Sequence, residues 1–387
     1  PAIAGVAFTG SLPTARRIEQ AMASHLDPQA PLIAETGGLN AMIVDSTALT
    51  EQAVRDILAS AFQSAGQRCS ALRIVYVQED VAERTVHMLK GAMDELVLGN
   101  PWHLAADIGP IIDSAARDKI AAYIAARQSQ VLHALSAPDT GTFIAPTLIA
   151  VEGIKALPEE IFGPVVHVAT FKGDGLPQVI ADINGSGYGL TFGLHTRISS
   201  RVKHLADTVH AGNIYVNRNQ IGAVVGSQPF GGEGLSGTGP KAGGPHYLPR
   251  FTRDAHIGLQ STAFDLPGPT GESNRLHALG RGTLLCLGPT PTDRAAQQVM
   301  AETAGCRAIE GELDTVDLTA GNGFAAVAFF GDSAGQRAVR QGLSLRTGPL
   351  LPLLTGPGDL PRLQIERHVC IDTTAAGGNA TLMAAAL

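Results

Sequence analysis

Short apolar segments alternate with helical patterns along the chain, and this alternation limits the fold more than any other feature. Runs of apolar residues at 3–9, 71–77 and 190–195 have the length and composition of buried strands. The segments 13–25 and 49–65 place apolar residues three or four positions apart, which predicts helices with one buried face. Strands and helices that alternate in this way build a mainly parallel sheet covered by helices. The sequence therefore predicts an α/β fold.

The composition is that of a folded chain without a strong bias. The 387 residues are 44% hydrophobic and 16% charged, which suits two or more globular domains. A net charge of −7 argues against binding of nucleic acid by this region. No apolar run is long enough to cross a bilayer, and the chain does not open on a signal peptide. We therefore expect a cytoplasmic protein with neither a membrane span nor a nucleic-acid partner.

The cysteines and histidines show no pattern of a metal site. The four cysteines, Cys69, Cys286, Cys306 and Cys370, are far apart in the sequence and form no CxxC pair. The 12 histidines have no metal-ligand spacing. We expect no bound metal. We also expect all four cysteines to be reduced, with a structural role for each of them except Cys69.

Cys69 lies in a small polar turn between a predicted helix and a predicted strand. Such a junction is accessible to a substrate, and the neighbouring Arg68 and Arg73 favour a thiolate. A buried structural cysteine is the commoner role of a lone cysteine, so the turn alone does not decide between the two. Glu35, on a glycine-rich turn 34 residues upstream, favours the reactive role. A cysteine nucleophile and a carboxylate base suit an oxidation that passes through a thioester and ends in hydrolysis.

The motifs Glu-Thr-Gly-Gly at 35–38 and Gly-Gln-Arg-Cys-Ser at 66–70 resemble the aldehyde dehydrogenase superfamily. The resemblance covers the whole chain and is strongest to the branch that oxidises L-glutamate γ-semialdehyde to L-glutamate with NAD. It implies a catalytic domain with a parallel sheet, a remnant of a Rossmann-type NAD domain, and a small C-terminal Rossmann-like α/β domain. It also makes Cys69 the nucleophile and Glu35 the base that activates water for hydrolysis.

Two short segments are candidates for binding NAD. Thr9, Gly10 and Ser11 follow a predicted strand and open a helix, where backbone N–H groups attract phosphate, although Ser11 suits an ordinary helix cap equally well. The resemblance favours the phosphate role. It also implies that Glu160 holds the nicotinamide ribose and that Phe162 packs by the nicotinamide, although adjacent acids are usually plain solvated charge. The GxGxxG pattern at 232–237 follows no strand, and we interpret it as a chance match in a surface loop.

A glycine-rich loop at 220–232 is the candidate substrate site. By resemblance, the main chain of Gly222 and Ala223 and the hydroxyl of Ser70 hold the substrate carboxylate, and Phe230 lines its aliphatic part. The alternative is a purely structural glycine loop. Cys69 and Glu35 favour the binding role.

The chain divides into five predicted parts. Residues 1–34 are expected to be the C-terminal piece of the NAD-binding domain, and 35–250 the catalytic domain. Residues 251–270 form a linker and return segment that ends in a Pro-Gly-rich stretch. A restarted strand–helix pattern predicts a small C-terminal α/β domain at 271–365 without a phosphate-binding motif. The last part, 366–387, resembles a tail that contributes to a homo-oligomer by adding a strand to a neighbouring sheet.

The resemblance places several expected parts before residue 1. They are the family's oxyanion asparagine, its adenosine-binding lysine and the first strands of the NAD domain. An FAD-dependent proline dehydrogenase domain precedes them in bifunctional members, and no residue of this chain is expected to bind FAD. We therefore expect this chain alone to be inactive.

Two other functions remain open from the sequence. An acylating dehydrogenase would pass the thioester to coenzyme A, and Glu35 argues against it because only hydrolysis needs a base. A non-catalytic oligomerisation scaffold is the second alternative. The intact Cys69, Glu35, Ser70 and Glu160 argue against it for a complete protein, whereas it stays open for the chain alone.

Overall fold

The computed structural model describes residues 3–252, 263–319 and 323–374. The chain forms two compact units, and each is described here by itself. The central unit comprises Gly38–Ala223, Gly268–Asn274 and Val369–Leu387. The N/C unit comprises Pro1–Gly37, Val224–Pro267 and Arg275–His368.

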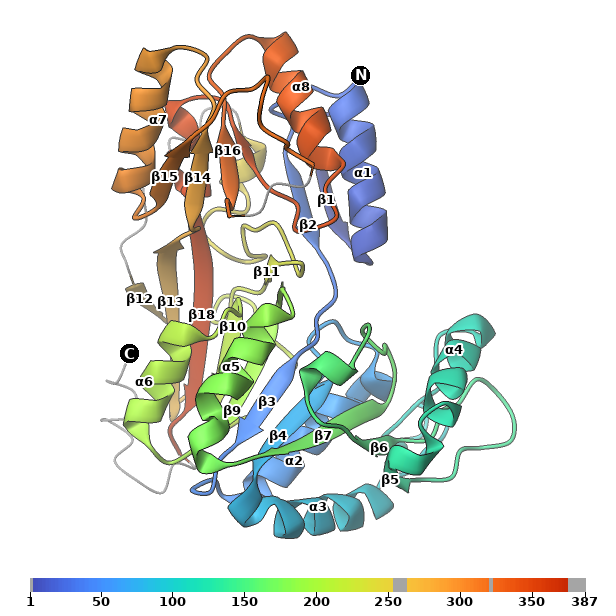
Figure 1. Cartoon of the computed structure of the whole chain (residues 1–387). Helices are drawn as coiled ribbons and strands as arrows, with labels where there is room; N and C mark the ends of the chain where they lie inside the picture. The colour runs from blue at the N-terminus through green and yellow to red at the C-terminus, as the bar shows by residue number, and fades with distance from the viewer. Residues whose placement is uncertain (1–2, 253–262, 320–322, 375–387) are drawn as a thin grey trace. The chain divides into compact units, whose positions relative to one another are not determined.

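The central unit is built on a mainly parallel sheet (Figure 1). Its strands follow the order β10-β9-β3-β4-β7-β6-β5, and among them β5 alone runs antiparallel to its neighbour. This sheet confirms the predicted α/β fold. The strands are β3 (Ala41–Val44), β4 (Ile74–Gln78), β5 (Val131–Ala134), β6 (Thr147–Ala150), β7 (Val165–Phe171), β9 (Thr191–His195) and β10 (Asn213–Val216), and the short strand β8 (Tyr188–Gly189) is not part of this sheet.

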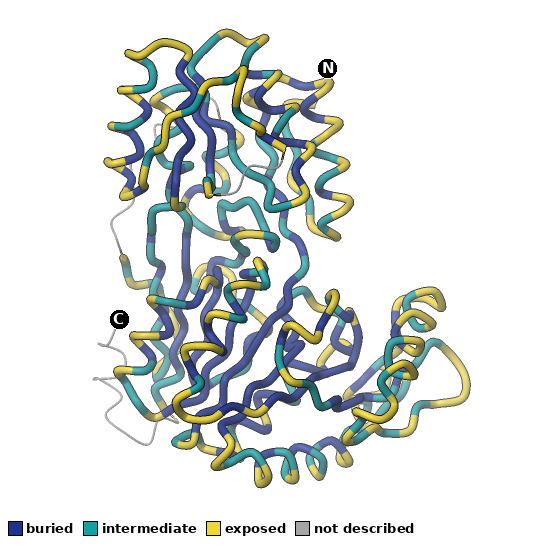
Figure 2. The backbone as a smooth tube through the Cα atoms, in the orientation of Figure 1, coloured by how far each residue is buried: buried dark blue, intermediate teal, exposed yellow. Residues whose placement is uncertain are grey.

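The two faces of this sheet bury different helices, because side chains alternate along a strand. Ala41 and Ile43 of β3 belong to the core that includes α5 and α6, whereas Met42 and Val44 belong to the core under α2 and α3. Figure 2 shows these strands as the most deeply buried part of the unit. The helices are α2 (Thr50–Phe62), α3 (Glu79–Asp94), α4 (Ser114–Ala125), α5 (Leu176–Gly185) and α6 (Ser199–Thr208).

The N/C unit contains two small parallel sheets. β1 (Val6–Thr9) and β2 (Leu32–Glu35) pair in parallel and are joined by α1 (Leu12–His25). A four-stranded parallel sheet has the order β15-β14-β16-β17, as predicted for the C-terminal α/β segment. Its elements are β14 (Thr283–Cys286), α7 (Pro291–Thr303), β15 (Arg307–Glu310), β16 (Ala326–Ala328), α8 (Ser333–Ser344) and β17 (Leu353–Leu354). The shorter strands β11 (Glu233–Gly234) and β12 (Ala263–Leu266) also lie in this unit, and β13 (Glu272–Gly280) and β18 (Gln364–Asp372) supply residues to both units.

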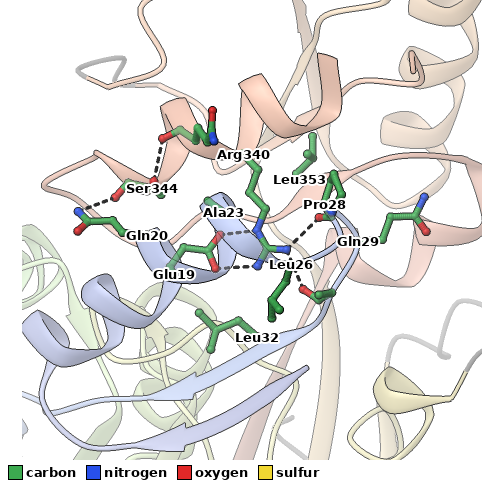
Figure 3. Close-up of polar contacts among 12 residues, drawn as sticks. Glu19, Gln20, Ala23, Leu26, Pro28, Gln29, Leu32, Arg340, Ser344 and Leu353 are labelled. Atoms are coloured by element: carbon green, nitrogen blue, oxygen red, sulfur yellow. Dashed lines mark hydrogen bonds and ion pairs between the residues drawn. The ribbon is translucent and has the colours of Figure 1, made fainter. Parts of the chain in front are cut away.

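Helices α1 and α8 pack against each other within the N/C unit. Arg340 of α8 forms a two-pronged ion pair with Glu19 of α1, with nitrogen–oxygen distances of 2.8 and 2.9 Å (Figure 3). The same guanidinium donates to the carbonyls of Asp27, Pro28 and Ala30. Arg340 therefore ties the N-terminal segment to the C-terminal sheet through a fully bonded buried charge.

The elements on either side of Cys69 are shorter than the sequence predicts. The helix expected at 49–65 ends at Phe62, because Ser64 and Ala65 adopt left-handed backbone angles with φ of 53°. The strand expected at 71–77 begins only at Ile74. The N–H groups of Arg73 and Ile74 donate to the carbonyl of Asn40, which lies before strand β3. The polar turn around Cys69 is therefore longer than predicted.

The C-terminal tail differs from the predicted free edge. The residues from Val369 to Ile371 are at most 1% exposed, because the end of β18 lies between β10 and the start of β13. A strand that is paired on both sides has no edge to offer to a neighbouring sheet. The prediction of strand addition is therefore wrong for 369–372, and the part of the tail from 375 onward lies outside the described residues.

Candidate active site

The turn that carries Cys69 is held from inside the central unit by two buried polar side chains. The Asn40 amide, 2% exposed, donates to the carbonyls of Cys69 at 2.6 Å and Ala71 at 2.9 Å. Arg73, 1% exposed, donates to the carbonyls of Gly66 at 2.8 Å and Arg68 at 3.0 Å. These bonds leave Cys69 itself half-buried in a fixed turn. A positioned, partly accessible thiol is what nucleophilic catalysis requires.

Arg73 also brings the predicted nicotinamide residues to this turn. Its guanidinium pairs with Glu160 at 2.8 Å and lies 5.3 Å from the ring centre of Phe162. Burial raises the pKa of Glu160, and the charge of Arg73 opposes that rise. Phe162 is 45% exposed, which leaves one face of its ring for a ligand. The ribose contact of Glu160 stays a prediction, and so does the effect of Arg73 on the thiolate.

Ser70 and the glycine loop are connected through a buried glutamine. Ser70 is 5% exposed, and its carbonyl accepts from the Thr191 hydroxyl at 3.2 Å and the Gln220 amide at 3.4 Å. Gly222 follows two residues later with a left-handed φ of 71°, and it is exposed. Ala223 is half-buried. The start of the loop is therefore bonded to Ser70 through Gln220, and the role of Gly222 and Ala223 in holding a substrate stays a prediction.

Glu35 lies at the end of β2 in the N/C unit. β1 runs parallel to β2, with Thr9 opposite Glu35, and the N–H of Gly10 donates to the Glu35 carbonyl at 3.1 Å. Ser11 caps α1 by accepting from the N–H of Thr14 at 3.4 Å, so the structural role of Ser11 is present. The exposed N-terminus of this 14-residue helix starts at the carboxyl edge of two parallel strands, where α/β folds bind phosphate. These residues fit a dinucleotide phosphate, and the proposed base ends the neighbouring strand.

The Glu35 carboxylate is enclosed by the glycine loop at 231–237. Its Oε2 accepts from the N–H of Gly232 at 2.9 Å. A Cβ on Gly231 would lie 2.7 Å from Oε1, and one on Gly237 would lie 3.0 Å from Oε2, so a side chain at either position would displace the carboxylate from its present place. Oε1 is buried and has no hydrogen-bond partner among the described residues. Burial raises the pKa of Glu35 to about 8, against the Gly232 hydrogen bond and the charge of Lys241, which lower it.

Lys241 is the functional candidate that the sequence did not single out. It is 2% exposed, and Ser236 in the glycine-rich loop before it is fully buried, so the prediction of a surface loop at 232–237 is wrong at Ser236. The Lys241 ammonium donates to the carbonyl of Gly231, next to the Glu35 carboxylate. Burial lowers the pKa of Lys241 to about 8, although the nearby charges of Glu35 and Glu366 raise it. The loop encloses a carboxylate and a lysine, which explains its glycines without a phosphate.

The predicted site residues fall into the two units as follows. Those of the central unit are Cys69, Ser70, Glu160, Phe162, Gly222 and Ala223. Those of the N/C unit are Thr9, Gly10, Ser11, Glu35 and Phe230. Phe230 is half-buried, and its N–H donates to the carbonyl of Ala242 at 2.9 Å.

Asn40 and Gln220 were the other residues that the sequence did not identify. Asn40 closes the predicted glycine turn after Glu35, and Gln220 opens the predicted substrate loop. The only signal for them in the sequence was that each residue stands at one end of a candidate motif. Their contacts join segments far apart in the sequence, which local patterns do not reveal.

Metal sites, disulfides and membrane-spanning helices are absent from the described part of the chain. No group of three or more histidine, cysteine or acidic side chains there is arranged to hold a metal. None of the four cysteines forms a disulfide, and Cys286, Cys306 and Cys370 are buried. No helix among these residues is both long and apolar enough to span a membrane.

Comparison with known proteins gives a consistent set of matches. The model of the aldehyde dehydrogenase family matches residues 1–257. The bifunctional protein PutA of Salmonella typhimurium is 40% identical over 470 aligned positions, which cover 98% of this chain and 36% of PutA. A 1-pyrroline-5-carboxylate dehydrogenase of Bacillus cereus is 39% identical over 251 positions, 63% of this chain and 48% of that protein.

Two solved structures agree with these matches. A crystal structure of a bifunctional PutA has a TM-score of 0.63 and 53% identity, covering 65% of this chain and 26% of PutA. The 1-pyrroline-5-carboxylate dehydrogenase from Thermus with bound NAD has a TM-score of 0.58 and 33% identity, covering 63% of this chain and 48% of that protein. The chain thus spans little more than a third of the length of the PutA relative from Salmonella.

Proposed function

Because the chain belongs to the aldehyde dehydrogenase family, we propose that it carries the chemistry of an NAD-dependent oxidation of L-glutamate γ-semialdehyde to L-glutamate. The observation that carries the proposal is the Glu35 carboxylate, buried with an unpartnered oxygen at the edge of the cofactor turn. Support also comes from relatives named as 1-pyrroline-5-carboxylate dehydrogenase and from the NAD-bound structure of one of them.

The proposed reaction begins at Cys69. Its thiolate attacks the aldehyde carbon and forms a hemithioacetal, and the Cys69 N–H donates to the resulting alkoxide. NAD, when bound, accepts the hydride that leaves this carbon. The residues that would hold NAD are the turn Thr9, Gly10 and Ser11 for the pyrophosphate, with Glu160 at the ribose and Phe162 beside the nicotinamide.

Glu35 completes the proposed reaction as a general base. Its carboxylate takes a proton from water, and the hydroxide attacks the thioester to release L-glutamate and the Cys69 thiolate. A pKa of about 8 matches this task better than an ordinary carboxyl, because the base and the water must exchange a proton near neutral pH. The closed glycine loop keeps the carboxylate away from other donors that would neutralise it.

The broader biology of the chain is also a proposal. The PutA relatives are named as bifunctional and are almost three times as long as the matched region, which is consistent with an FAD-dependent proline dehydrogenase domain in the same polypeptide. We further propose a cytoplasmic homo-oligomer that acts in proline catabolism. In the same scheme residues 1–34 belong to the NAD domain, 35–250 to the catalytic domain, 251–270 to a linker and return segment, 271–365 to the C-terminal α/β domain and 366–387 to the tail.

The choice of substrate tests this proposal. Ser70 and the main chain of Gly222 and Ala223 would replace water around the substrate carboxylate, so the complete protein should prefer the semialdehyde over pentanal by roughly a hundredfold in kcat/KM. Ser70→Ala should narrow that ratio by weakening only the carboxylate-bearing substrate. Ser114→Ala, the same change at an exposed position on α4, is the control. Equal reaction of both aldehydes would contradict the proposed substrate site.

A further inference from the structure

A cavity of about 130 Å³ lies inside the N/C unit. Its walls come from the segment after α1, from the loop at 238–250 and from the segments around α8 and β17. One wall is apolar, and the residues that form it include Leu343, Leu350, Leu351 and Leu353. Figure 3 shows the Arg340 side of this region, with Pro28, Gln29 and Leu32 beside it. Neither Glu35 nor Cys69 lines the cavity.

The charged side chains that line the cavity are not balanced. Five cations and three carboxylates line the cavity, so the lining itself holds two more cations than carboxylates. The cations are Lys241, Arg250, Arg281, Arg340 and Arg362, and the carboxylates are Glu19, Glu233 and Glu366. Buried charges are normally paired, because an unpaired charge loses its hydration without compensation.

Three of these cations have anionic partners inside the protein. Arg340 pairs with Glu19, and Arg362 pairs with Asp359 at 3.0 Å. Lys241 lies in the field of three carboxylates, Glu35, Glu366 and Glu233. The excess charge is therefore not located on these three side chains.

Arg281 and Arg250 are the two lining cations without an ion pair among the described residues. Arg281 donates to two neutral carbonyls, those of Arg362 at 3.0 Å and Thr238 at 3.3 Å, and pairs with no carboxylate among the described residues. Arg250 has no side-chain hydrogen bond or ion pair within the described ranges. Burial and the neighbouring charge of Arg362 lower the pKa of Arg250 to about 9 and that of Arg281 to about 10. Both groups stay charged at pH 7. The charges of Asp359 near Arg250, and of Glu233 and Glu366 near Arg281, act on them without forming an ion pair.

We propose that this cavity binds a small organic dianion, a short dicarboxylate or a phosphate monoester, whose negative groups pair with Arg250 and Arg281. Guanidinium groups bind both anions through two parallel N–H donors, which supports either ligand. The leucine wall accommodates the hydrocarbon part of the ligand, so an inorganic ion alone leaves that wall unfilled. Arg250 and Arg281 have no part in the proposed oxidation, although Gly232 and Lys241, which act on Glu35, also line the cavity.

Binding of three probes to the complete protein tests the proposal by calorimetry and thermal unfolding. The probes are glutarate, propyl phosphate and the neutral diamide glutaramide. At least one dianion should bind and raise the unfolding midpoint, since a ligand that binds only the folded state stabilises it, and glutaramide should have no effect. Which dianion binds distinguishes the carboxylate from the phosphate source.

Arg250→Gln separates a binding site from a structural role. The variant should lose at least tenfold in affinity for the dianion, and it should unfold at the same or a higher temperature than the parent without ligand, because it removes a half-buried cation that has no ion pair among the described residues. Arg250→Lys should retain part of the affinity. Arg84→Gln, in an exposed ion pair of the central unit, should change neither property.

The results that overturn the proposal are equally specific. They are no binding of either dianion, equal binding of glutaramide, unchanged affinity in Arg250→Gln, or a lower unfolding midpoint of unliganded Arg250→Gln. Ser70→Ala should leave this binding intact, because Ser70 belongs to the proposed substrate site. Loss of dianion binding in Ser70→Ala would place the ligand in the substrate site and would also overturn the cavity proposal.

Discussion

Glu35 and Glu160 are half-buried residues, one in each unit of this chain, and their carboxylates differ in how they are paired. Glu160 in the central unit bonds a buried arginine at 2.8 Å, and that arginine is also bonded to the turn that carries Cys69. Glu35 in the N/C unit has one backbone hydrogen bond and one buried oxygen without a partner. Burial raises the pKa of both, to about 8 for Glu35.

The difference suits the two roles proposed for these residues, ligand binding for Glu160 and proton exchange for Glu35. An ion pair fixes the position of Glu160 and keeps it charged, which suits a residue that accepts ligand hydroxyls. The charged form of a carboxylate is unfavourable in a closed pocket when one oxygen has no hydrogen-bond partner, so its pKa rises. The nearby charge of Lys241 lowers the pKa of Glu35 and so partly offsets this rise. Pairing, more than burial, therefore distinguishes the two roles.

The largest effect should come from breaking the Arg73–Glu160 pair. Arg73→Met keeps the length of the side chain but leaves Glu160 and the carbonyls of Gly66 and Arg68 without their donor. Removal of one partner of a buried pair costs about 3 kcal/mol of unfolding free energy at a site where Glu160 keeps slight exposure. Urea unfolding followed by circular dichroism measures it.

Arg84→Met is the matched control for this change. Arg84 pairs with Glu51 on the surface of the same unit, with both side chains about two-thirds exposed, so the variant should unfold like the parent. Equal unfolding of Arg73→Met and Arg84→Met would show that the buried pair does not organise the Cys69 turn.

A smaller effect should appear in the pH dependence of thioester hydrolysis. Glu35 acts as a base only when ionised, so hydrolysis should rise with pH through about 8 and level off above it. Lys241→Met removes a charge that lowers the pKa of Glu35, so the rising limb should move upward by about one pH unit. Single-turnover rates between pH 6 and 10 measure this limb.

Lys203→Met, which removes a lysine from an exposed helical ion pair, should leave the limb in place. An unmoved limb in Lys241→Met would mean that the lysine and Glu35 are not coupled electrostatically.

The sequence predicted the parts of this molecule that depend on local patterns. The alternating strands and helices predicted the parallel sheet, and the glycine-rich turn after β2 identified Glu35 as a candidate. The sequence did not predict that Lys241 is buried, because a lysine in a glycine-rich loop usually faces solvent. It also did not show the bonds from Asn40 and Gln220 to the segment around Cys69, since these depend on how the sheet brings distant segments together.

The prediction of an edge strand in the C-terminal tail was wrong at β18 for the same reason. Small residues and a short β segment suggested an edge strand, but pairing on both sides is decided by strand order in the sheet. Strand order depends on contacts between distant segments, and local patterns in a single sequence do not reveal these contacts.

The most direct test of the central claim is the mass of the protein after one rapid exposure to NAD and the semialdehyde. In the complete protein with Glu35→Gln, we expect a burst of NADH and one stable acyl adduct on Cys69, because the thioester forms but water is not activated. Glu35→Gln combined with Cys69→Ser should give neither the burst nor the adduct, and Glu51→Gln, at an exposed acid, should turn over like the parent. An unchanged steady-state rate in Glu35→Gln without an adduct on Cys69 would contradict the account.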